Sequence, residues 1–177
     1  MKHLSRALWL VPLIAHVAYL LATSRALPEA FGAKPWSSDD GASSRLFLVE
    51  WLSVVGLANA ALLAVHVRLP RLGDRLLAVP RKDYWLGSEA HRAELVERLR
   101  GFVETALLLL NVFFLAVYQS IYQSNAARPS VFVPRDVLVV GFMAVPLLLV
   151  ALAFARLVLG LRSTARNAAP PREGVDG

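Results

Sequence analysis

Two pairs of polar side chains occur at the same spacing inside two apolar stretches of the chain. Asn59 and His66 are seven residues apart, and so are Glu104 and Asn111. On a helix, residues seven apart lie on the same face. If the two stretches run antiparallel, Asn59 meets Asn111 and His66 meets Glu104 in one register, because both pairs of residue numbers have the same sum. The spacing therefore predicts two adjacent helices whose polar faces are in contact.

This polar set is compatible with two kinds of role. A proton or ion path could run inward from one surface through His66 and Glu104 to the amides, with His16 at a similar depth to the amides. Alternatively, His16, Asn59, His66, Glu104 and Asn111 link helices by hydrogen bonds, each worth about 0.6–2 kcal/mol. We favour the structural role, because the third stretch stays apolar for almost two turns beyond Asn111. A small proton- or ion-coupled transporter is the alternative.

No other residues form a recognisable catalytic or cofactor site. The chain has no cysteine, which excludes disulfides, thiolate metal sites and cysteine nucleophiles. It also lacks the glycine patterns of nucleotide-binding loops and the serine of a nucleophile elbow. Haem between His16 and His66 is disfavoured, because their depths differ by about 10 Å at 1.5 Å per residue. We therefore expect no catalytic residue, metal or cofactor, although His66 with Glu104 leaves an embedded enzyme open.

The elements that carry these residues are predicted by apolar runs. Of the 177 residues, 56% are hydrophobic and only 18% are charged. Four runs, at about residues 7–23, 46–67, 102–121 and 137–161, are each close to the roughly 20 residues needed to cross about 30 Å of hydrocarbon. Within that layer the backbone must bond to itself, which predicts helices. We expect an all-α, integral membrane four-helix bundle over residues 1–162. A cleaved signal peptide is the alternative for the first run, whose length favours a retained helix.

Lys and Arg residues predict the orientation. With the N-terminus inside, the inner segments hold 14 of the 19 Lys and Arg residues, as the excess of positive charge in cytoplasmic loops requires. Both termini are then cytoplasmic, and residues 163–177 form a disordered cytoplasmic tail. Because the basic residues flank apolar runs, we expect contact with lipid headgroups and not with nucleic acid.

The cytoplasmic loop between the second and third runs is expected to be partly helical. Its second half begins at Ser88, which can cap a helix, and Glu94 is spaced to pair with Arg98. No proline interrupts the chain from there into the third run. We therefore expect one continuous helix from Ser88 to about Gln123.

Small residues form a series on the second run. Gly56, Ala60 and Ala64 recur at every fourth position, and such faces allow close approach of two helices. Packing within the bundle or contact with a second copy would use this face, and we expect packing within the bundle.

The most distinctive stretch of the chain is residues 79–89, which read V-P-R-K-D-Y-W-L-G-S-E. Basic residues next to a Tyr-Trp pair suit the headgroup region, either as an anchor for the loop or as a docking surface for a cytoplasmic partner or anionic lipid. We favour the anchor. The candidate residues of this inner-loop motif are Pro80, Arg81, Lys82, Asp83, Tyr84, Trp85 and Glu89.

This motif resembles the inner-loop signature of a bacterial membrane-protein family of unknown function. In that family a P-N-K/R-E/D-Y-W-L-x-P-E segment leads into the third of four spans, and the family is related to the immunity proteins for a sporulation-delaying toxin. In span order and loop length the resemblance covers the chain from about Leu27 to Leu161. The outer loop departs from the family pattern: Ala30-Phe31-Gly32 follows Leu27-Pro28 without the family's His, which puts any role of that His in doubt.

The resemblance implies a non-enzymatic, multi-pass protein of a bacterial inner membrane. Its expected role is sensing, immunity or service as an accessory subunit, because the related immunity proteins act as toxin-neutralising sensors. The partners implied are the lipid bilayer and either another membrane protein or a second copy of the chain.

Overall fold

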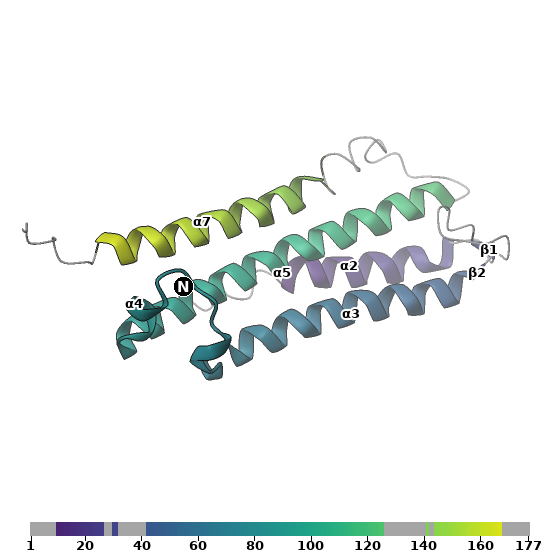
Figure 1. The fold of residues 1–177 in the computed structure, drawn as a ribbon. Coiled ribbons are helices and arrows are strands. Elements are labelled where there is room, and N and C mark those ends of the chain that lie inside the picture. Colours follow the sequence, from purple (N-terminus) through teal and green to yellow (C-terminus); the bar gives the residue numbers. More distant parts are fainter. Residues whose placement is uncertain (1–9, 27–29, 32–41, 126–140, 142–143, 168–177) are drawn as a thin grey trace, which may run out of the picture.

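The part of the chain that the computed structural model describes, residues 10–26, 30–31, 42–125, 141 and 144–167, is almost entirely helical (Figure 1). The main helices are α2 (Leu10–Thr23), α3 (Ser44–Arg68), α4 (Lys82–Leu86), α5 (Glu89–Asn125) and α7 (Val145–Asn167). Three-residue 3-10 turns span Ser24–Ala26, Leu69–Arg71 and Asp74–Leu76. The two-residue strands β1 (Ala30–Phe31) and β2 (Ala42–Ser43) pair antiparallel, with Ala30 opposite Ser43. The predicted all-α class is confirmed for these residues.

Three of these helices are long and apolar enough to cross a membrane. The qualifying segments are Leu46–Arg71, Glu89–Gln123 and Val145–Asn167, which indicates a multi-pass membrane protein. Helix α2 is also apolar, but its 14 residues cover only about 21 Å at 1.5 Å per residue. The start of the predicted first span, residues 7–9, lies outside the described residues.

The boundary of the predicted tail is wrong at residues 163–167. Helix α7 continues to Asn167 instead of ending near Leu161. The reason is packing: Leu161 and Ala165 are only 1% and 2% exposed, so the last turns of α7 still bury one face against the protein. The rest of the tail, residues 168–177, and residues 137–140 of the predicted fourth span lie outside the described residues.

Helix α5 lies at the centre of the arrangement. In Figure 1 it runs between α7 and α3, and the long helices alternate in direction along the chain. Helices α2, α3, α4 and α7 all contact α5. Three buried clusters follow α5 from one end to the other, and each includes an α5 side chain: Tyr118 with Leu20, Val103 and Leu107 with Leu69, and Leu95 with Trp85 and Leu161.

The predicted continuity of α5 is confirmed. Its 37 residues extend about 55 Å at 1.5 Å per residue, which is more than the hydrocarbon layer requires. Ser88 Oγ accepts the backbone N–H of His91 at 3.2 Å, which caps the first turn. Arg98 donates to Glu94 at 2.6 Å, the spacing that the sequence predicted. The helix extends slightly past the predicted end, to Asn125.

The prediction that the small residues of α3 pack within the bundle is wrong. Gly56, Ala60 and Ala64 are exposed, and a Cβ atom added to Gly56 would meet no atom within 4 Å. Val55 and Asn59 are buried instead, at 3% and 4% exposure. Successive residues of a helix are rotated by about 100°, so the face that α3 presents to its neighbours excludes the small residues.

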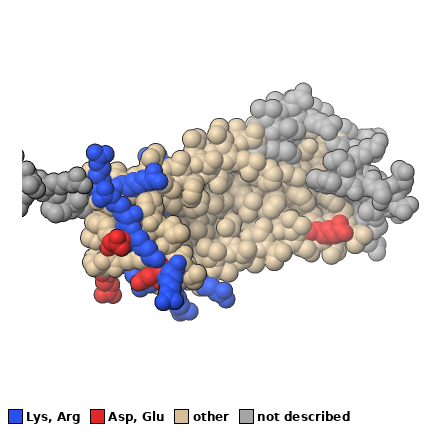
Figure 2. All heavy atoms as spheres, in the orientation of Figure 1, with Lys and Arg blue, Asp and Glu red and all other residues tan. Residues whose placement is uncertain are grey.

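Charged side chains of the described residues gather at one end of the molecule, which we call the charged end. Figure 2 shows Lys, Arg and most of the acidic residues there, followed by a wide band without charge on this face. The charged end is where α3 ends, α4 lies, α5 begins and α7 ends (Figure 1). An apolar band bounded by charge is the surface expected of a protein whose middle lies in lipid.

Candidate functional site

The two buried amides form a closed hydrogen-bonded pair between α3 and α5. Asn59 Nδ2 donates to Asn111 Oδ1 at 3.1 Å, and Asn111 Nδ2 donates to Asn59 Oδ1 at 2.8 Å. Each amide also donates to the carbonyl four residues earlier in its own helix, on Val55 and Leu107. Both hydrogens of each amide are thereby used. The pair is a satisfied link between helices and presents no free amide hydrogen to a ligand.

His66 and Glu104 form the second contact of the same register. His66 Nε2 lies 3.0 Å from Glu104 Oε1, and the two side chains are 25% and 24% exposed. This pair lies two turns from the amide pair, toward the charged end. The predicted antiparallel register of the two helices is thus confirmed at both pairs. Both side chains of this pair are partly exposed, whereas the two amides and His16 are buried.

His16 does not share the depth of the amides, and that expectation is wrong. Trp51 Nε1 donates to His16 Nε2 at 2.9 Å, and the two rings stack with centroids 6.0 Å apart. Trp51 lies eight residues before Asn59 on α3, about 12 Å at 1.5 Å per residue. The displacement arises because the described part of α2 packs beside the start of α3 and the end of α5 (Figure 1). His16 therefore forms a separate site from the amide pair.

An aromatic layer surrounds His16 and continues toward the C-terminal end of α5. Tyr118, which is fully buried, lies 5.9 Å from the His16 ring and bonds to Thr23 Oγ1 at 2.8 Å. Trp51 also makes an edge-to-face contact with Phe114 at 5.8 Å. Because an indole N–H can only donate, His16 Nε2 accepts, and the neutral ring carries its proton on Nδ1. The spacing of the polar residues on α3 and α5 does not indicate this His–Trp contact, because the contact joins α2 to α3.

Beyond the amide pair, apolar side chains separate the polar residues of α5 from one another. Phe114, 8% exposed, and Ala116, 3% exposed, follow Asn111 on the helix. The next polar contacts occur at Tyr118 with Thr23 and at Tyr19, whose hydroxyl donates to Gln119. Within the described residues, these polar side chains therefore form two separate clusters, with apolar and aromatic side chains packed between them.

The inner-loop motif forms a folded part of the protein, in which the Trp85 ring contacts other side chains and has no exposed surface. Trp85 is 0% exposed and packs with Leu77, Leu95 and Leu161. Arg98 lies over its ring, 5.4 Å from the centroid. The apolar surface offered by α5 and the end of α7 explains the burial, since a large aromatic ring is stabilised by contact with apolar side chains. Trp85 therefore ties α4 to both helices.

The other motif residues hold the same turn in place or face outward. Arg81 immediately precedes α4 and has a left-handed backbone, φ 53°. Tyr84 stacks on His91 with centroids 4.2 Å apart, and its carbonyl oxygen lies 3.1 Å from His91 Nδ1. The exposed motif residues are Arg81, Asp83 and Glu89, whereas Pro80, Lys82 and Tyr84 are half-buried.

Within the described residues, no three His, Asp or Glu side chains group closely enough to hold a metal ion. No protein-family model, curated protein or solved structure matches the chain. The resemblance of the inner-loop motif to a bacterial family therefore stays a prediction.

Proposed function

We propose that the protein is a non-enzymatic, multi-pass protein of a bacterial inner membrane that serves as a sensing, immunity or accessory subunit. The observation that carries this proposal is the closed amide pair between α3 and α5. Asn59 and Asn111 satisfy each other, and His16 is fully buried against Trp51. An amide pair with no free hydrogen favours a scaffold that binds through its ends over a protein that processes a substrate in its middle.

The continuous helix α5 gives such a scaffold a connection between its two ends. One end packs with α4 and the inner-loop motif through Leu95 and Trp85. The other end packs with α2 and the start of α3 through Tyr118. An unbroken helix of 37 residues can transmit a displacement between a partner at one end and the motif at the other, as a sensor requires.

Orientation belongs to the same proposal, with α2 as the first of four spans. The end of α3, the start of α5 and the end of α7 share the charged end, which we place in the cytoplasm by the positive-inside rule. Reporter fusions at the C-terminus test this: a cytoplasmic reporter should be active and a periplasmic one inactive. The reverse pattern would reject the orientation.

A transporter is the second candidate, and one observation favours it. His66 and Glu104 are partly exposed and hydrogen-bonded, as an entry point for protons would be. Against it, Phe114 and Trp51 fill the space beyond the amide pair in edge-to-face contact. We therefore favour the accessory or sensing role.

Two measurements test the choice. Photo-crosslinkers at the exposed motif residues Asp83 and Glu89 should yield discrete protein adducts in native membranes, whereas one at the exposed apolar Leu57 on α3 should react with lipid. In proteoliposomes under a pH gradient, the protein should conduct no protons above empty vesicles. Absence of any protein adduct from either motif position would contradict the first role. Proton flux that the Glu104→Gln variant abolishes would establish the second.

A further inference from the structure

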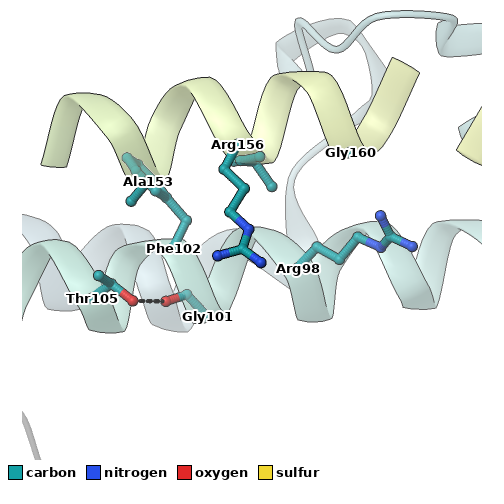
Figure 3. A pocket seen from close by; sticks show the side chains of 8 residues that line it. Arg98, Gly101, Phe102, Thr105, Ala153, Arg156 and Gly160 are labelled. Carbon is teal, nitrogen blue, oxygen red and sulfur yellow. Dashed lines mark hydrogen bonds between the residues drawn. The ribbon is translucent and has the colours of Figure 1, made fainter. Parts of the chain in front are cut away.

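A groove between α5 and α7 contains two arginines, Arg98 and Arg156. Neither takes part in the hydrogen bonds that join the polar faces of α3 and α5. The groove has a volume of about 350 Å3, and its lining includes Arg98, Gly101 and Phe102 of α5 and Arg156 and Gly160 of α7. Figure 3 shows Arg156 reaching from α7 toward α5, while Phe102 reaches from α5 toward α7. We propose that this groove binds the phosphate of an anionic phospholipid between Arg98 and Arg156, with the acyl chains along the adjoining apolar surface.

The charges of the groove are suited to an anion. Arg98 uses Nε and one terminal nitrogen, Nη2, to bond Glu94, and its plane lies over Trp85. Its other terminal nitrogen, Nη1, faces Gly160, where an added Cβ would lie 3.7 Å away. Arg156 has no acidic partner among the described residues. Guanidinium groups recognise phosphate oxygens with paired N–H donors, which makes arginine a preferred phosphate ligand.

The groove also lies at the depth of lipid phosphates. On α5 no charged residue occurs from Thr105 to Asn125, a stretch of about 30 Å, which matches the hydrocarbon thickness. Arg98 and Gly101 come just before it. In the antiparallel pairing of α3 with α5, Arg68 of α3 lies opposite Phe102 of α5 and therefore at the depth of the groove. The boundary between hydrocarbon and headgroups therefore falls at the groove on both helices.

The surroundings favour a lipid over free phosphate as the occupant. Phe102 and Phe154 meet between the two helices with centroids 5.8 Å apart. On the hydrocarbon side of Arg156, Leu149 and Leu152 of α7 are 43% and 54% exposed, so apolar surface for acyl chains adjoins the two cations. The groove is open at Gly101, where an added Cβ would meet no atom within 4 Å. Basic pockets between membrane helices at the cytoplasmic side are suited to anionic headgroups.

Native mass spectrometry of the detergent-solubilised full chain, titrated with phosphatidylglycerol or with phosphatidylcholine of the same acyl chains, tests the proposal. The wild type should retain phosphatidylglycerol preferentially. The Arg156→Gln variant should bind it about fivefold more weakly, the effect of about one basic residue at an anionic surface. The Gly101→Leu variant should also lose binding, because it fills the groove and keeps both cations.

Two matched controls separate the groove from general effects. Arg162→Gln removes an exposed arginine of α7 that does not line the groove, and Gly56→Leu adds a side chain at an open glycine on α3. Both should retain wild-type binding. Equal loss in Arg156→Gln and Arg162→Gln, or unchanged binding in Gly101→Leu, would overturn the proposal. Displacement of the lipid by millimolar inorganic phosphate would show a free-phosphate site and would also overturn it.

Discussion

Replacement of the amide pair by leucine tests how α3 and α5 are held together. The Asn59→Leu and Asn111→Leu variants each remove both interhelical bonds, at 3.1 and 2.8 Å, and keep a side chain of similar size. Interhelical bonds in membrane proteins average about 0.6 kcal/mol each and reach about 1.7 kcal/mol, so two bonds give a loss of about 1–3 kcal/mol. The amide left behind in each single variant also loses its interhelical partners and keeps only the bond to a carbonyl of its own helix, so one buried N–H and the amide oxygen are left unsatisfied.

The double variant distinguishes this interpretation from simple loss of packing. With both amides gone, no polar group is left unsatisfied, so the double variant should cost less than the sum of the two single variants. The free energy of unfolding can be measured in mixed micelles of a neutral detergent and dodecyl sulfate, with helicity followed by circular dichroism. Ser53→Ala is the control, because its hydroxyl bonds only Val49 of its own helix. Additive costs in the double variant would refute the closed pair.

Three further changes probe other contacts. Glu104→Gln should cost less than about 1 kcal/mol in the same assay, because the amide can keep the hydrogen bond and the pair is partly exposed; a larger loss would contradict this. Trp85→Ala should cost about 3–5 kcal/mol and should speed maleimide labelling of a cysteine placed at the buried Ala165, whereas unchanged labelling would show that α7 does not depend on Trp85. Gly87→Ala should lower the melting temperature, because its Cβ would lie 2.6 Å from a backbone oxygen of α4, whereas Gly73→Ala, which meets no atom, should not; equal melting temperatures would refute the close approach.

Sequence reasoning predicted the parts of the fold that depend on periodicity. The register of α3 and α5 follows from two polar pairs at equal spacing, and the structure has both contacts. The continuity of α5 follows from Ser88 and the absence of proline. Spacing along one chain is sufficient in these cases, because each helix already fixes which of its residues share a face.

Contacts among three elements could not be predicted in this way. The placement of Trp85 depends on the surfaces of both α5 and α7, and composition alone made a headgroup anchor equally reasonable. The depth of His16 depends on how α2 packs against α3 and α5, which the spacing of residues along one helix does not define. In the sequence, Arg156 is only a charged residue within an apolar run, and nothing indicates a groove beside it. Its partner Arg98 comes from a helix surface whose orientation the sequence left open.

The rotation of α3 about its axis provides the last prediction. This helix is apolar almost all round, and lipid is as apolar as a leucine side chain, so burial of apolar surface cannot select one face over another. The amides can select one face, because α3 must turn Asn59 toward Asn111 for the two side chains to form hydrogen bonds. A bimane label on a cysteine at Gly56, an exposed position, should be quenched by brominated lipid much more than one at the buried Val55. In the double leucine variant helicity should persist while this difference shrinks. An undiminished difference would show that packing alone orients α3.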